Sequence, residues 1–281
     1  MARSKSHAAR NAMVALALGT GMAFAPNVAK GQTASAQAAP LATNSVEMVN
    51  ASMTTTFATR YVKAGGGAVG EGPVNQNTFD VNLGNGQGLM LTGTVWTDYN
   101  FGTEKTDEVD LDATVSDKFA FIGNGPFKGT LTTSLAFQDW KYPSGLEGSH
   151  DDYVLLPTIA YNGPVTLKLM DYHLLDDHWS WDRNMVRVDL SKTFDVAKLW
   201  GGTLSVTPGI RTAYNDNFGK CNGYRYVAPS ITVAWTRGAW TVSGFLRHQS
   251  SVSEVVKTFD YYGISVSISD LGKGFRQLLR E

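Results

Sequence analysis

Several features that define other protein classes are scarce in this sequence of 281 residues. A single cysteine, Cys221, excludes a disulfide within the chain. Charged residues make up only 17% and form no basic stripe, so a nucleic-acid partner is not expected. Beyond the first 38 residues no window of 18 apolar residues occurs, so no helix is expected to span a membrane. Stability must therefore come from a fold that needs neither cross-links nor apolar helices.

Glycine and aromatic residues are abundant instead. The chain contains 29 glycines, and aromatic residues make up 11%, a mixture that favours many strands joined by glycine turns. This composition predicts an all-β protein.

The first 38 residues have the organisation of a secretory signal peptide. Three basic residues precede the apolar stretch 13–25, and the small-residue site Ala36-Gln37-Ala38 follows. We predict a signal peptide over 1–38 and a short linker over 39–50, with a disordered leader or amphipathic arm as the alternative. Because residues 1–38 hold four basic and no acidic side chains, their removal changes the formal charge from −1 to −5.

From residue 51 onward the dominant pattern has a period of two. In segments 109–116, 186–191 and 227–235, apolar side chains alternate with polar or small ones. The runs are about ten residues long, which is typical of tilted membrane-spanning strands and longer than most soluble strands.

Twelve such runs can be counted, and an even number returns the chain to the side where it started. We therefore predict a transmembrane up-and-down antiparallel β-barrel of about 12 strands over residues 51–269, followed by a polar C-terminal tail over 270–281. The expected strands lie near 52–63, 74–83, 88–98, 106–118, 128–140, 151–161, 164–174, 182–193, 202–214, 223–236, 239–249 and 257–269.

The connections fall into two sets. One side has short turns at 84–88, Asn162-Gly163 and Arg237-Gly238, and Asn-Gly is a strong hairpin signal. Two longer connections, at 122–127 and 195–201, are expected on the same side. Short turns are typical of the periplasmic side of outer-membrane barrels, which makes the opposite side extracellular.

The aromatic residues are expected to form two girdles at the ends of the strands. The same alternation is also compatible with a soluble sandwich or a lipocalin-like barrel, because alternation does not show which face meets lipid. The periplasmic girdle would contain Phe119, Tyr161, Phe194, Trp200, Trp235 and Trp240, and the extracellular girdle Tyr99, Phe101, Trp140, Tyr142, Tyr172, Trp181, Tyr214, Tyr224, Phe259 and Tyr262.

If the apolar faces meet lipid, the charged residues in the opposite phase face the interior. Twelve strands lie between the eight that side chains can fill and the sixteen that leave a wide pore, which favours an aqueous channel over charges that pair and block the interior. The channel-lining candidates are Arg60, Asp80, Asp110, Asp112, Lys168, Arg187, Asp189, Arg211 and Arg247.

One loop invites a different interpretation. Within segment 171–181, His173 and His178 flank two aspartates and precede Ser180, which suggests a metal site or a hydrolase triad. Neither G-x-S-x-G nor H-E-x-x-H occurs, and nothing fixes a nucleophile beside a base. Likewise, Gly65-Gly66-Gly67 lacks the strand-to-helix context of a phosphate-binding loop. We therefore expect no catalytic residue, metal or cofactor.

The chain resembles the small outer-membrane porins of Gram-negative bacteria, especially the TorF-like putative porins. The resemblance rests on "FATRYVKAGG", "GPVNQNTFDVNL", "LTGTVWTDYNF", "EVDLDATVSDKF" and "YYGISVSIS". It implies a barrel with a channel role and specifies no solute. Residues 270–281 depart from the pattern, because such barrels usually end on an aromatic residue that the insertion machinery reads.

Together these features predict an outer-membrane channel for passive diffusion of small hydrophilic solutes. The expected partners are the lipid bilayer, the barrel-insertion machinery, periplasmic chaperones and small polar solutes. Two alternatives stay open: an outer-membrane lipid hydrolase using His173 or His178 with a nearby serine, and a structural or receptor barrel with a blocked lumen.

Overall fold

The computed structural model describes residues 49–64, 66, 68–69, 72–84, 88–121, 128–143, 151–175, 183–216, 222–253 and 256–278. The predicted signal peptide (1–38), nearly all of the predicted linker, His178 and Cys221 lie outside these residues.

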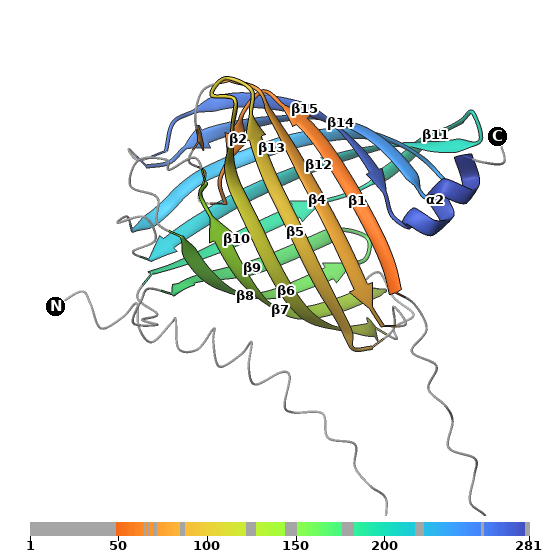
Figure 1. Cartoon of the computed structure of the whole chain (residues 1–281), viewed down its shortest axis with the longest axis horizontal. Coiled ribbons are helices and arrows are strands. Elements are labelled where there is room, and N and C mark those ends of the chain that lie inside the picture. Colours follow the sequence, from red (N-terminus) through yellow and green to blue (C-terminus); the bar gives the residue numbers. More distant parts are fainter. Residues whose placement is uncertain are drawn as a thin grey trace, which may run out of the picture. The chain divides into compact units, whose positions relative to one another are not determined.

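The described residues are almost entirely β-strand (Figure 1). The strands are β1 (Val49–Ala58), β2 (Tyr61–Val62), β3 (Ala68–Val69), β4 (Val74–Leu83), β5 (Met90–Asn100), β6 (Lys105–Phe121), β7 (Gly129–Lys141), β8 (Asp152–Asn162), β9 (Thr166–Leu175), β10 (Arg183–Ser191), β11 (Phe194–Leu199), β12 (Gly202–Asp216), β13 (Gly223–Arg237), β14 (Trp240–Ser251) and β15 (Phe259–Ile268). One helix, α2 (Leu271–Leu278), follows the last strand.

The strands close into one antiparallel barrel. Sheet order runs β10-β9-β8-β7-β6-β5-β4-β1-β15-β14-β13-β12, and an additional pairing of β10 with β12 closes the ring. Strands β10 and β11 pair with the same edge of β12, one after the other, and together occupy one place in the ring. Strands β2 and β3 form a separate hairpin, so the ring contains twelve strands. The predicted fold class and strand number are therefore confirmed.

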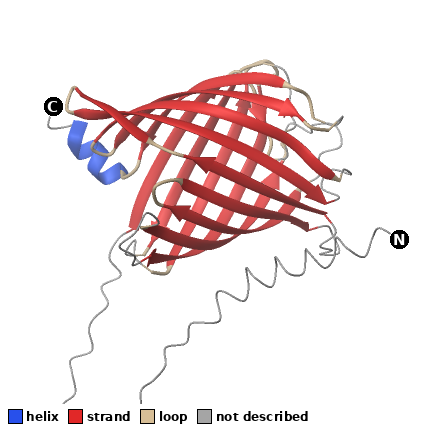
Figure 2. Ribbon diagram, turned by 180° about the vertical axis from the view of Figure 1, so that it is seen from behind, coloured by secondary structure: helices blue, strands red, loops and turns tan. Residues whose placement is uncertain are grey.

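The two ends of the barrel differ in their connections. We call the end that carries the connections β1–β4, β5–β6, β7–β8, β9–β10, β12–β13 and β14–β15 the loop end. The other end, which carries the remaining connections, the start of β1 and the helix α2, is the turn end (Figure 2).

Residues 195–201, predicted as a longer connection, are mostly strand, and that prediction was wrong. Strand β12 is 15 residues long, and β10 pairs only with its residues 209–215. The main-chain groups at the start of β12 therefore need another strand as their partner. Strand β11 pairs with this extension through a β-bulge at Asp195/Ala197, and Trp200 and Gly201 turn the chain with positive φ values. The result is a hairpin that continues the barrel wall at the turn end.

The alternation separates two faces of the wall. Large apolar side chains such as Leu111, Leu190 and Ile264 are exposed on the outside. On the inside, Thr56 lies opposite Ser265 with their hydroxyls 2.8 Å apart, at the seam where β1 meets β15. Small polar residues thus line the interior while apolar residues cover the exterior, as in a transmembrane barrel.

The predicted polar tail contains the helix α2. Asp270 caps its start, because its Oδ1 accepts a hydrogen bond of 2.8 Å from the Lys273 N–H. The Trp240 Nε1–H donates to the Gly274 carbonyl at 3.3 Å and so joins the helix to the turn end. Nowhere in the described part of the chain is a helix long and apolar enough to cross a membrane.

Candidate functional site: the barrel interior

All nine predicted channel-lining residues face the interior. Eight lie on barrel strands in phase with the inward Thr and Ser residues, and Arg60, just after β1, lines an interior cavity. Their inward placement follows from the pairing register, whereas their role in lining a channel stays a prediction.

Five of the nine form a basic wall on one side. Lys168 (β9), Arg187 (β10) and Arg211 (β12) surround Asp189. Arg211 holds Asp189 with Nε and Nη2, each 2.9 Å from a carboxylate oxygen, and Arg187 Nε lies 3.4 Å from the same group. This two-point pairing fixes the orientation of both groups. Arg60 and Arg247 complete the basic wall.

The acidic wall lies on β4, β5 and β6. Asp80 accepts hydrogen bonds from Ser52 (3.0 Å) and Thr94 (2.7 Å), and Asp112 accepts one from Gln138 (2.8 Å). These carboxylates are held by neutral cross-strand partners and not by basic ones.

Two members of the acidic wall, Asp98 and Glu108, were missed by the sequence prediction. Both are almost fully buried. The register pairs Asp98 with Glu108 across β5 and β6, and Glu108 is in phase with Asp110 and Asp112. That shared phase was the signal that would have identified Glu108.

The two walls face each other across the barrel. In the ring of twelve strands, six steps separate β5 from β12 in either direction. The strands that carry most of the acidic wall therefore lie opposite those that carry most of the basic wall. The acidic wall contains Asp80, Asp98, Glu108, Asp110 and Asp112, and the basic wall contains Arg60, Lys168, Arg187, Arg211 and Arg247.

A short hairpin folds into the lumen at the loop end. This inward hairpin, β2–β3 (Tyr61–Val69), is held on one side by Glu108, whose Oε2 accepts a hydrogen bond of 2.6 Å from the Tyr61 hydroxyl. On the other side the Tyr226 hydroxyl donates to the Ala64 carbonyl at 3.1 Å, and Gln249 donates to the Gly66 carbonyl at 2.7 Å. Since six steps also separate β6 from β13, these contacts tether the hairpin across the full width of the barrel.

Gly66 is required for this close approach. Its φ of 83° is unfavourable for other residues, and a Cβ at this position would collide with the ring of Tyr226. The hairpin therefore contacts the opposite wall through bare backbone.

An apolar cluster fills the lumen beside the hairpin. This loop-end cluster contains Trp140, Tyr142, Val154, Met170, Tyr172, Leu174, Met185, Ala213, Tyr226, Ala228 and Val256. Its members come from β7–β10, β12, β13 and two loops, and Val154 and Met185 are completely inaccessible. The loop end of the lumen is therefore packed like a protein core.

The loop-end cluster corrects the predicted extracellular girdle. Trp140, Tyr142 and Tyr172 are only 8%, 8% and 6% exposed, so they do not lie on the lipid-facing surface. The physical reason is their phase: Trp140 lies two residues after Gln138 and Tyr172 four residues after Lys168, so each shares the inward face of its strand with these residues. By contrast, Tyr224 and Tyr262 are exposed on the outside, as a girdle requires, while Trp181 lies outside the described residues.

His173 lies on the outer face of β9 and has partners at both ring nitrogens. Nε2 is 3.0 Å from Asp171 Oδ2, and Nδ1 is 2.6 Å from Asn184 Oδ1. Neither nitrogen is free in this arrangement to accept a proton from a nucleophile. In the described part of the chain, no three His, Cys, Asp or Glu side chains are grouped as a metal site would need.

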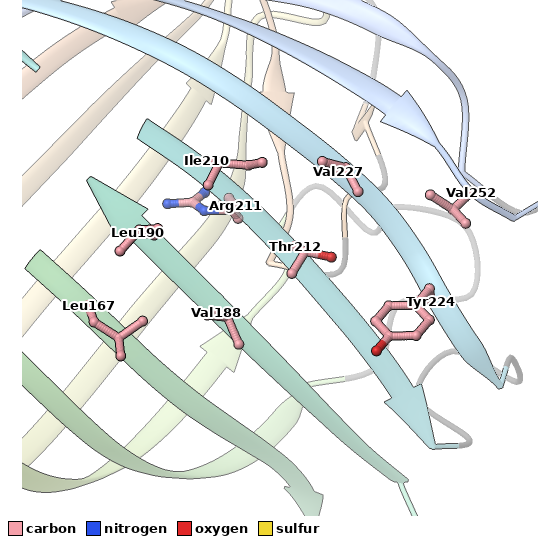
Figure 3. A pocket seen from close by; sticks show the side chains of 9 residues that line it. All are labelled: Leu167, Val188, Leu190, Ile210, Arg211, Thr212, Tyr224, Val227 and Val252. Atoms are coloured by element: carbon pink, nitrogen blue, oxygen red, sulfur yellow. The ribbon is translucent and has the colours of Figure 1, made fainter. Parts of the chain in front are cut away.

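An apolar groove of about 360 Å³ lies on the outer wall (Figure 3). Leu167, Leu190 and Ile210 line it from β9, β10 and β12, and all three are more than 40% exposed. The groove continues the apolar exterior, which a bilayer would cover.

Comparisons with known proteins give only weak similarities. No family model and no curated protein sequence matches the chain. Among solved structures it is similar to Pseudomonas aeruginosa OccK9 (OpdG), with 11% identity and a TM-score of 0.29 over 77% of this chain and 70% of that one. It is also similar to the transport unit of the autotransporter AIDA-I from Escherichia coli, with 10% identity and a TM-score of 0.31 over 92% of this chain and 97% of that one. Values this low establish neither a shared family nor a shared function.

Proposed function

We propose that the chain is an outer-membrane channel for passive diffusion of small hydrophilic solutes, whose passage is controlled by the inward hairpin. The apolar exterior supports the membrane location, because a soluble protein rarely exposes so many large apolar side chains together. The turn end, with its short connections, would face the periplasm and the loop end the cell exterior.

The observation that carries the proposal is the pair of opposed charged walls in a polar lumen. The acidic wall lies on β4–β6, whereas the basic wall is carried by β9, β10, β12 and β14, with Arg60 just after β1. Asp189, which lies within the basic wall, is held by two hydrogen bonds from Arg211. Oppositely charged walls orient and select hydrated solutes that pass between them. The proposal includes no catalytic role and no cofactor.

The predicted signal peptide, the insertion machinery and the periplasmic chaperones belong to the same proposal, since an outer-membrane barrel requires export and insertion. The finer assignment to the TorF-like putative porins rests on the sequence segments alone.

A second candidate is a structural or receptor barrel with a blocked lumen. The loop-end cluster and the tethered hairpin favour it, because together they fill the lumen with buried side chains. In that case the loops at this end would carry the function.

Conductance across a planar bilayer separates the two candidates. The purified, folded barrel is reconstituted at low protein concentration, and discrete current steps are expected. A barrel whose heat-modifiable gel mobility shows correct folding, yet which gives no steps at any voltage, would exclude the channel and favour the receptor.

A further inference from the structure

A polar cavity of about 300 Å³ lies inside the barrel, and Val62 of the inward hairpin contributes to its lining. Thr56 and Ser265 contribute hydroxyls to its lining, and Gln76 contributes an amide. Three arginines complete the lining: Arg60 from the chain between β1 and β2, Arg211 from β12 and Arg247 from β14. The volume is at the lower end of the range for small-ligand pockets.

Two of the three arginines have no acidic partner among the described residues. Arg60 stacks on Phe259, with Cζ 4.8 Å from the ring centroid, and its buried Nε has no hydrogen-bond partner. Arg247 donates from Nη1 to the Tyr261 hydroxyl at 2.8 Å, and its Nε also has no partner. The aromatic contacts hold both guanidinium groups in place without neutralising them.

Only Arg211 is neutralised, through its two bonds to Asp189. Asp189 is also the single carboxylate among the described inward-facing residues of β9, β10 and β12–β15, where Lys168 and Arg187 add further positive charge. The cavity therefore has an excess of positive charge and of unused N–H donors, which is costly unless an anion or water occupies it.

We propose that this cavity is a binding site for a small oxyanion, such as a carboxylate or a phosphate, held between Arg60 and Arg247. Planar guanidinium groups pair with two oxygens at once, which matches both kinds of anion. The hydroxyls of Thr56 and Ser265 share one hydrogen bond of 2.8 Å, which leaves one hydroxyl proton to donate to a further oxygen of the anion. Because the cavity is interior, the ligand is a free solute and not a lipid headgroup.

This site rests on the proposed function, for which it names small oxyanions as the class of solute. Binding of an oxyanion in the cavity does not, however, require that the oxyanion pass through the barrel. Val62 is the residue that the inward hairpin contributes to the lining, so a bound oxyanion would lie beside the hairpin as well as between the barrel strands.

Isothermal titration calorimetry of the folded, full-length barrel in detergent tests the inference with two probes, inorganic phosphate and succinate. We expect saturable binding of at least one probe, with the stronger binder identifying the preferred oxyanion. Arg60→Gln and Arg247→Gln should each weaken binding by about tenfold or more, since each removes a charged hydrogen-bond donor. Arg237→Gln, beside the turn between β13 and β14 and outside the cavity, is the matched control and should leave the affinity unchanged.

Absence of binding by both probes, or equal binding by the Arg60→Gln/Arg247→Gln double variant, would overturn the site. Conductance recorded on the same preparations keeps the two proposals apart. Current steps without oxyanion binding leave the channel standing and reject the site, whereas binding without current steps supports the site and rejects the channel.

Discussion

The two ends of the lumen are lined by the same strands yet are filled differently. At the loop end, aromatic and apolar side chains from β7–β10, β12, β13 and two loops pack beside the inward hairpin. Toward the turn end, the same inward phase carries small residues such as Thr54, Ser243 and Ser267. Alternation thus decides which side chains point inward, whereas side-chain size decides whether the lumen is filled.

Removal of the inward hairpin should have the largest effect, because it would make the loop end of the lumen more open and so more like the turn end. Replacement of residues 61–69 by a Gly-Ser linker of equal length removes the Tyr61 hydroxyl that Glu108 binds. The main-chain carbonyls that Tyr226 and Gln249 bind then lie on a segment with no hairpin to hold them in place. We expect a several-fold rise in single-channel conductance, because the hairpin crosses the lumen between opposite strands. Unchanged conductance in a correctly folded variant would show that the loop-end cluster alone, or another segment, limits the current.

Weakening one of the hydrogen bonds that hold the inward hairpin should also raise the current, but by less than removal of the whole hairpin. Glu108→Gln weakens the 2.6 Å hydrogen bond from Tyr61 and removes the charge that lies 3.9 Å from Lys63 Nζ. If the tethered hairpin closes the channel and its release opens it, loss of a charged hydrogen bond should shift the balance between these two states by about tenfold. Open probability in single-channel records measures the shift. Glu104→Gln, in the exposed β5–β6 connection, is the control that should behave like the unmodified barrel.

The strand pattern was predictable from the sequence because a barrel with an apolar exterior and a polar interior imposes it. In segment 109–116, Leu111, Ala113 and Val115 lie on the exterior, and Asp110 and Asp112 therefore face inward. The inward phase of the nine charged candidates follows from the same constraint. Period two needs no tertiary information, so strand number and facing can be read directly.

The filling of the loop end was not predictable from alternation alone. The inward hairpin is too short for a periodic signal, and its tethers are remote in sequence, 47 residues from Tyr61 to Glu108 and 162 from Ala64 to Tyr226. Trp140 and Tyr172 do carry the inward phase in the sequence. Their position at strand ends nevertheless suggested a girdle, and only the register shows that they fill the lumen.

Neutralising single charges on the two walls should shift ion preference in opposite directions. Arg187→Gln is expected to favour cations and Asp80→Asn to favour anions. Each permeability ratio should change about two- to fivefold, since one charge in a wet lumen contributes on the order of 1 kcal/mol. Reversal potentials under a salt gradient measure both ratios. Lys192→Gln, exposed after the end of β10, controls for effects outside the lumen, and equal shifts in the same direction for both wall variants would contradict opposed walls.

Truncation after Ser269 should have the smallest effect, because the helix α2 lies outside the lumen at the turn end. Its removal eliminates a 3.3 Å hydrogen bond from Trp240 and the cap formed by Asp270, but no pairing between strands. Loss of one such hydrogen bond costs about 1 kcal/mol, which corresponds to roughly 2–4 °C in Tm for a domain of this size. Heat-modifiable gel mobility should persist and conductance should not change. A truncated chain that fails to fold would show that α2 supports closure of β1 against β15, and the turn end would then depend on packing as the loop end does.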